Sequence, residues 1–235
     1  MIRVRHKILA MAGLACAALG VQAQPRPAVI ELFTSEGCSS CPPAEALIGE
    51  LAQRPTVLAL SFHVDYWDNL GWRDRFGIAE ATPRQRQYAK SLALPTVYTP
   101  QAVIDGERDF VGSDRRAIEH ALGTGREGVP VAVSIHDDAV QVVIDAATLP
   151  RPCEVTLVAY QRSAVSSIGR GENSGRTLVE WNIVRAVRKL GRYSGTAQTY
   201  QAPVASLPGD ATDVAVLVQT EGLGPIVAAS HRSIR

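Results

Sequence analysis

Two cysteines separated by two residues form the part of this sequence best suited to chemistry. The Cys-Ser-Ser-Cys motif at residues 38–41 lies between a predicted strand, residues 28–33, and a predicted helix that follows it. The N terminus of a helix offers unpaired N–H groups and a partial positive charge, both of which stabilise a thiolate over a thiol. Cys38 is therefore predicted to be the nucleophile of thiol–disulfide exchange, and Cys41 the thiol that resolves the mixed disulfide.

The same cysteine spacing is compatible with two other kinds of site. One is a structural disulfide in a non-catalytic binding module, where losing the bond would cost about 2 to 4 kcal/mol of stability. The other is a copper site, because Cu(I) prefers soft thiolates and could be bound by Cys38, Cys41 and His63. A zinc site would need a second close pair of ligands, which Cys153 and the histidines downstream do not provide. Redox exchange without a bound cofactor is the leading hypothesis.

The amino terminus indicates the compartment. Residues 1–23 contain basic residues, then an uncharged run of about 14 residues, then a small-residue cleavage site, which is the pattern of a signal peptide. The apolar run is shorter than the roughly 20 residues that cross a bilayer, so no stable membrane anchor is expected after cleavage. The mature protein is predicted to be periplasmic or secreted, where disulfides persist, and Cys153 is expected to be a buried free thiol.

Composition and charge restrict the possible partners. The chain has 235 residues, of which 46% are hydrophobic and 20% charged, as in a folded globular protein. Lys and Arg number 24 against 23 Asp and Glu, giving a net charge of +1, which is too balanced for an electrostatic nucleic-acid surface. The predicted partners are proteins or small molecules that carry thiols or disulfides.

The elements that position the motif follow from hydrophobic periodicity. A strand at 28–33, a helix at 44–51 and a strand at 57–62 predict a parallel pair with a right-handed crossover. An irregular aromatic segment at 65–77, a helix at 82–92, a hairpin at 102–111 and a helix ending at 122 complete an α/β unit predicted over residues 26–125. Seven alternating segments predict an antiparallel, β-rich, sandwich-like domain over 126–235; they are 129–135, 140–144, 153–160, 177–190, 196–202, 214–220 and 226–230.

The first unit resembles proteins of the thioredoxin fold. Its strand, C-x-x-C, helix and strand are in the order of that fold, and residues 98–114 are similar to the glutaredoxin segment in which a cis-proline precedes a strand, a turn and a helix start. The resemblance covers about residues 28–123. It implies that Pro100 is a cis-proline facing the dithiol and that the backbone of Thr99 pairs with a bound peptide or thiol. The Ser-Ser pair between the cysteines and the 59 positions from Cys41 to Pro100 depart from both families.

The whole chain also resembles a family of secreted bacterial proteins classed as a domain of unknown function. The residues that carry this resemblance are Phe33 to Cys38, His63 to Trp67, and the β-rich tail. It implies export and fold but no reaction. Tyr66 and Trp67, with other aromatic residues nearby, are predicted either to form an apolar lip that binds substrate or to be satellite core. Glu31, on the first strand, is interpreted as a proton relay to Cys41 or as an edge-facing carboxylate.

Overall fold

A computed structural model of the chain describes residues 24–123 and 125–234. Residues 1–23 lie outside this range, so the signal peptide stays a prediction. The described residues form a β-rich protein with the α-helices α1 (Pro42–Leu51), α2 (Ala81–Ser91) and α3 (Arg115–Leu122). The strands are β1 (Gln24–Arg26), β2 (Ala28–Thr34), β3 (Val57–His63), β4 (Gln101–Ile104), β5 (Arg108–Val111), β6 (Arg126–Gly128), β7 (Val131–His136), β8 (Ala139–Ile144), β9 (Cys153–Ser167), β10 (Thr177–Tyr193), β11 (Gln198–Pro203), β12 (Asp213–Thr220) and β13 (Ile226–Ser233). Short 3-10 helices cover Asp68–Leu70 and Val204–Ser206.

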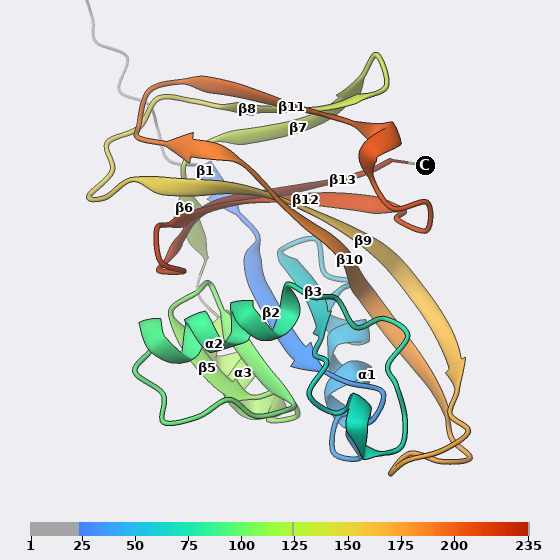
Figure 1. Cartoon of the computed structure of the whole chain (residues 1–235). Helices are drawn as coiled ribbons and strands as arrows, with labels where there is room; N and C mark the ends of the chain where they lie inside the picture. The colour runs from blue at the N-terminus through green and yellow to red at the C-terminus, as the bar shows by residue number, and fades with distance from the viewer. Residues whose placement is uncertain (1–23, 124, 235) are drawn as a thin grey trace, which may run out of the picture.

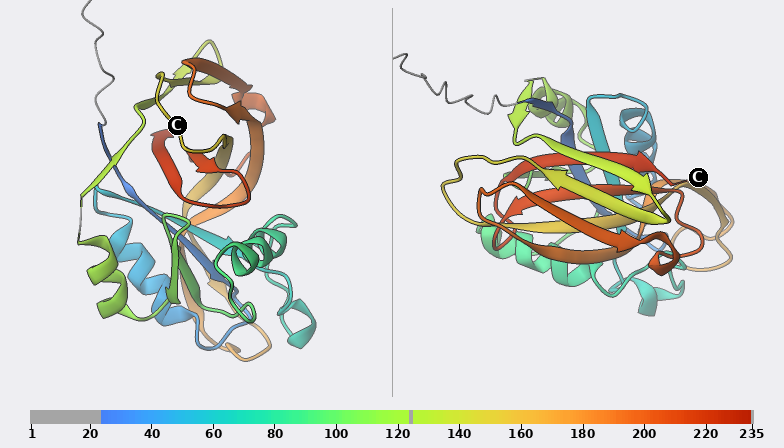
Figure 2. Two further views of the ribbon diagram at one scale, coloured as in Figure 1. Left: turned by 90° about the vertical axis from the view of Figure 1, so that its left-hand side faces the viewer. Right: turned by 90° about the horizontal axis from the view of Figure 1, so that it is seen from above.

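A large sheet of eight strands, in the order β13-β12-β9-β10-β3-β2-β4-β5, forms the centre of the molecule. β2 and β3 are parallel and are connected through α1, as the strand–helix–strand pattern predicts. β10 is parallel to β3, whereas the remaining neighbours are antiparallel, so the sheet is mixed. Every residue of β2 and β3 is buried because α1 and α3 cover one face of the sheet and α2 covers the other (Figure 2).

A long hairpin of β9 and β10 joins the two halves of the chain. β10 pairs with β9 along most of its 17 residues and with β3 at the register of Ile183 and Ser61. The central sheet therefore continues across the boundary predicted near residues 123–128, and where one unit ends and the next begins stays a prediction. The tip of the hairpin, residues 168–176, extends down to the loop before α1 (Figure 1).

A second sheet, in the order β11-β8-β7, packs over the outer strands of the central sheet (Figure 1). The core between the two sheets is built from every second residue along several strands, as the alternating sequence pattern predicts for this β-rich half. These inward-facing residues include Val140, Val142, Ile144, Val155, Leu157, Val214, Val216 and Val218. The short ribbon of β1 and β6 lies beside these layers. Among the described residues, no helix combines the length and the apolar character that crossing a bilayer requires.

Candidate functional site

The two cysteines of the motif form a disulfide at the start of α1. The Sγ atoms of Cys38 and Cys41 are bonded at 2.08 Å, and the Cα atoms lie 5.4 Å apart. Cys41 is the N-cap residue, and its carbonyl oxygen accepts hydrogen bonds from the backbone N–H groups of Ala44 and Glu45. The two prolines after Cys41 fit here, because the N–H groups of a first helical turn have no partner within the helix. The structure thus places the disulfide at the positive end of the helix dipole.

Both cysteines are covered by protein. Cys38 is 0% exposed and Cys41 1% exposed. The hairpin tip is bound to the backbone at this point: Asn173 is fully buried, and its Nδ2 donates to the carbonyl oxygens of Glu36 and Cys38, at 2.9 Å each. Because Cys38 has no exposed surface, we expect a substrate to reach it only after the segments around the motif, the hairpin tip among them, have moved.

A second contact fastens the same tip from outside. The Oε2 atom of Glu172 accepts hydrogen bonds from the hydroxyl and the backbone N–H of Ser39, at 2.6 and 3.2 Å. This contact is exposed to solvent, whereas the Asn173 contacts are buried. Trp72 packs against the tip at Gly171. The φ of Gly171 is +74°, a backbone conformation that residues with a Cβ atom rarely adopt.

The Thr99–Pro100 peptide bond is cis. Gly112 separates Pro100 from α1, since a Cβ atom added there would lie 3.0 Å from Pro100 Cβ and 3.2 Å from Ala44 Cβ. Pro100 is thus near the first turn of α1, the helix that carries Cys41. Its role opposite the dithiol stays a prediction.

The residues predicted to bind substrate separate into two groups. Trp67 Nε1 donates to Thr99 Oγ1 at 2.9 Å, and Trp67 Cβ lies against Gly37, so these two residues are together beside the motif. Tyr66 instead donates its hydroxyl to Gln85 Oε1 of α2, at 3.3 Å. The aromatic segment is therefore partly packed against the protein and partly close to the disulfide.

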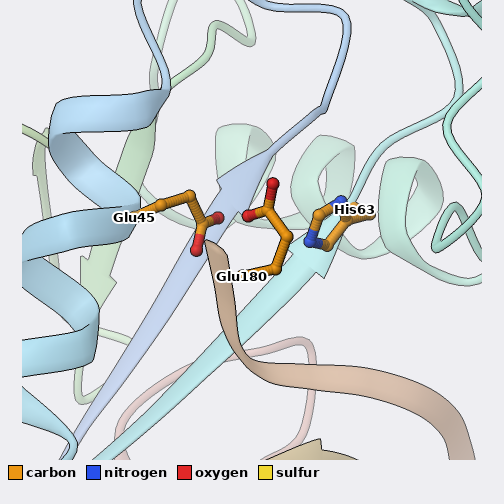
Figure 3. A group of neighbouring side chains, drawn as sticks. All are labelled: Glu45, His63 and Glu180. Atoms are coloured by element: carbon orange, nitrogen blue, oxygen red, sulfur yellow. The ribbon is translucent and has the colours of Figure 1, made fainter. Parts of the chain in front are cut away.

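Three buried titratable residues meet near α1; of these, only His63 was selected from the sequence, as a possible copper ligand, and the other two were missed. Glu45 comes from α1, His63 from the end of β3, and Glu180 from β10; their carboxylate oxygens and imidazole nitrogen lie within 4.8 Å of one another (Figure 3). Glu45 stands four residues after Cys41 and so on the same side of the helix, which is a signal the sequence did contain. Glu180 had no such signal, because its position depends on the pairing of β10 with β3.

Burial dominates the electrostatics of these groups. It raises the pKa of both Glu45 and Glu180 well above the ordinary value, and the nearby charge of Glu45 raises that of Glu180 further. For His63, burial acts to lower the pKa, but the charge and hydrogen bond of Asp74 outweigh it and the pKa is raised. For Asp74, burial acts to raise the pKa, but the charge and hydrogen bond of His63 outweigh it and the pKa is lowered. His63 Nδ1 and Asp74 Oδ2 are thus hydrogen-bonded inside the protein, at 2.8 Å.

Glu31 does not approach the disulfide. Its carboxylate is bound by Arg84 and by the Tyr88 hydroxyl, both from α2, on the face of the sheet opposite α1. The carboxyl-bearing residues that line a pocket together with Cys41 are Glu45 and Glu180, and Glu45 is on the same helix as the motif. The proton-relay interpretation therefore fits Glu45 rather than Glu31.

Cys153 is buried and free, as expected, and burial raises the pKa of its thiol. We expect iodoacetamide to label Cys153 at least tenfold more slowly in the native protein than in urea, because both burial and the low thiolate fraction oppose attack. Mass spectrometry of time points with and without urea measures the two rates. Equal rates would contradict the buried position of this thiol.

Comparison with known proteins gives a family and no reaction. A family profile described as "Protein of unknown function (DUF1223)" matches residues 29–219. The X-ray crystal structure of protein AGR_C_4864 from Agrobacterium tumefaciens is similar, with a TM-score of 0.79 and 32% sequence identity; the match covers 91% of this chain and 97% of that chain. No curated protein has significant sequence similarity to the chain.

Proposed function

The chain belongs to the DUF1223 family, whose function is unknown, and from the geometry of the Cys38–Cys41 site we propose that it is a thiol–disulfide oxidoreductase. A substrate thiolate attacks Cys38 Sγ, the Cys38–Cys41 bond breaks, and Cys41 leaves as a thiolate. A second substrate thiolate then attacks the mixed disulfide, which forms the substrate disulfide and leaves both cysteines reduced. The reverse sequence, with Cys38 as nucleophile and Cys41 as resolving thiol, reduces a substrate disulfide.

The observation that carries this proposal is the Cys38–Cys41 disulfide at the N terminus of α1. The helix dipole stabilises whichever sulfur is released there as a thiolate. Parallel β2 and β3 flank α1, and the cis peptide before Pro100 lies near the first helical turn. This combination supports a thioredoxin-like assignment for the first half of the chain.

The compartment and the partners are part of the same proposal. Export to the periplasm or beyond, through the predicted signal peptide at residues 1–23, would place the protein where disulfides form and exchange. Its substrates would be thiols or disulfides of proteins or small molecules. Trp67 and Thr99, which contact each other beside the motif, would form the first surface such a substrate meets once the hairpin tip opens.

Burial of both cysteines favours a second candidate, a structural disulfide in a non-catalytic module. In that case the bond stabilises the fold by about 2 to 4 kcal/mol and resists reduction. Copper handling has less support, because His63 Nδ1 is bound to Asp74 and the ring faces Glu45 and Glu180.

Redox titration and two serine variants separate these candidates. The mature protein is equilibrated in graded glutathione buffers and alkylated, and labels on Cys38 and Cys41 are counted by mass, with Cys153→Ala as the background. A reduction potential near or above about −230 mV would indicate an exchange-competent pair. A potential below about −300 mV would indicate either a structural bond or a strong reductant, and resistance of Cys38 to alkylation would then favour the structural bond. Cys38→Ser is expected to abolish exchange, whereas Cys41→Ser traps a mixed disulfide. Exchange that survives Cys38→Ser would overturn the assignment of the nucleophile.

A further inference from the structure

Glu45, His63 and Glu180 bring a chemically specific set of atoms together. They come from α1, β3 and β10, and all three are buried, at 4%, 0% and 1% exposure. One imidazole nitrogen and two carboxylate oxygens converge within 4.8 Å of one another (Figure 3). Two carboxyl groups face each other here without a basic side chain between them, which is an expensive arrangement inside a protein.

Each of these side chains has an atom without a hydrogen bond. Glu45 Oε1, His63 Nε2 and Glu180 Oε2 are buried and have no partner among residues 24–123 and 125–234. Buried polar atoms in folded proteins are almost always paired, so three unpaired atoms at one point require an explanation. A cation that bound all three would satisfy them together and would offset the charge of the carboxylates.

The surroundings of His63 fit metal ligation. Asp74 Oδ2 accepts a hydrogen bond from His63 Nδ1 at 2.8 Å, which leaves the Nε2 lone pair directed at the two glutamates. Backbone N–H groups of Glu36 and Phe76 donate to the same Asp74 carboxylate, at 2.7 and 2.8 Å, and hold it in place. A carboxylate on the far nitrogen is the usual partner of a histidine that binds a metal.

A pocket borders two of the three side chains. A pocket of about 300 Å³ is lined by Glu45 and Glu180 and also by Ser35, Cys41 and Trp181. An ion bound by three protein ligands keeps an open coordination position, as catalytic zinc sites do. The open position would lie on the side of the pocket, beside the disulfide.

From these observations we infer that Glu45, His63 and Glu180 bind a divalent first-row transition metal ion. One imidazole and two carboxylates suit Zn²⁺, Co²⁺ or Mn²⁺, whereas Ca²⁺ and Mg²⁺ prefer oxygen ligands alone and Cu(I) prefers sulfur. Asp74 is a positioning residue for His63. The inference does not depend on redox activity of the dithiol, because neither sulfur is among the ligands.

Zn²⁺ binding to the mature chain tests the site. The protein carries no polyhistidine tag, keeps the Cys38–Cys41 disulfide oxidised so that thiolates cannot compete, and is first treated with a chelator. Isothermal titration is expected to show one Zn²⁺ per chain with micromolar or tighter affinity. Co²⁺ in its place is expected to give the intense visible d–d bands of a low-coordinate site.

Glu180→Gln and Glu45→Gln remove one ligand charge each with little change in volume. Each is expected to weaken Zn²⁺ binding by about 100-fold or more, beyond the 10- to 100-fold typical of losing an outer partner. Glu172→Gln is the matched control, since the Glu172 carboxylate is near the motif but exposed. The Zn²⁺ affinity of this variant is expected to equal that of the unaltered protein. Circular dichroism checks that each variant is folded. Absence of stoichiometric Zn²⁺ uptake, or uptake unchanged in both ligand variants, would overturn the inference in favour of carboxyl groups that share a proton.

Discussion

Replacing Arg84 with methionine is expected to lower the free energy of unfolding by about 3 to 5 kcal/mol, because it leaves the buried Glu31 carboxylate without its counter-charge. Arg84 Nε and Nη2 donate to the two oxygens of Glu31, at 2.5 and 2.8 Å, and the side chains are 8% and 1% exposed. Tyr88 donates its hydroxyl to the same carboxylate at 2.5 Å. Methionine fills most of the volume of arginine, so the loss reports the charge rather than a cavity.

The pair also connects distant parts of the chain. Glu31 is on β2, Arg84 is on α2, and Arg84 Nη2 donates to Gln219 Oε1 of β12 at 3.1 Å. The effect is therefore expected to appear as one cooperative unfolding transition at a lower urea concentration, not as separate loss of one half of the chain.

Urea denaturation followed by circular dichroism measures the change. Arg54→Met is the control, because the Arg54–Glu119 pair is 41% and 35% exposed and its loss is expected to cost no more than about 1 kcal/mol. Adding Glu31→Gln to Arg84→Met is expected to restore part of the stability, since the uncompensated charge is then removed. A loss from Arg84→Met no larger than that from Arg54→Met would show that the buried pair does not hold these elements together.

Elements set by local patterns were predictable from the sequence. The apolar run at residues 28–33, the helical spacing after it and the second apolar run at 57–62 each need only near neighbours to determine strand or helix, and they are β2, α1 and β3. The disulfide follows in the same way, because three-residue spacing at a helix start brings Cys38 and Cys41 within bonding reach.

Contacts between distant segments were not predictable. Residues 177–190 were predicted to be an ordinary strand of a separate domain, but Asn182 there has a φ of +44° and its Nδ2 donates to Ala59 O of β3 at 2.8 Å. Asparagine tolerates that left-handed conformation, and no periodicity signals it. The pairing of β10 with β3 is what carries Glu180 to His63, so a single sequence gave no indication of the cluster.

Contacts made by loops were unpredictable for the same reason. The segment at 65–77 was predicted to be irregular, and it is, with only the short 3-10 helix at Asp68–Leu70. Its fold back onto β3 places Asp74 against His63, 11 residues earlier, and hydrogen bonds to the Asp74 carboxylate hold it there, which no repeating pattern signals. The same holds for the hairpin tip, whose side chains cover a disulfide more than 130 positions away.

Asn173→Ala is expected to increase the rate at which glutathione reduces the Cys38–Cys41 disulfide by roughly tenfold to 100-fold. The two hydrogen bonds from Asn173 Nδ2 to Glu36 O and Cys38 O form only while the hairpin tip covers the disulfide. Each contributes about 0.5 to 1.5 kcal/mol net, and the alanine variant also removes the donor to the Glu36 carbonyl oxygen, whereas Cys38 O keeps the backbone N–H of Cys41 at 3.2 Å. Every 1.4 kcal/mol lost from the covered state raises the population of the open state tenfold.

The measurement is the appearance of free thiols over time under excess glutathione, with the variant and the unaltered protein side by side. Ser174→Ala is the matched control: Ser174 is in the same tip, but its hydroxyl donates to Gly169 O and does not reach the motif. Its rate is expected to match that of the unaltered protein. If both variants accelerate reduction equally, the tip is merely loosened and Asn173 has no specific role. If neither does, opening of the tip does not limit access to Cys38, and the burial of this disulfide reflects a structural bond that exchanges through global unfolding.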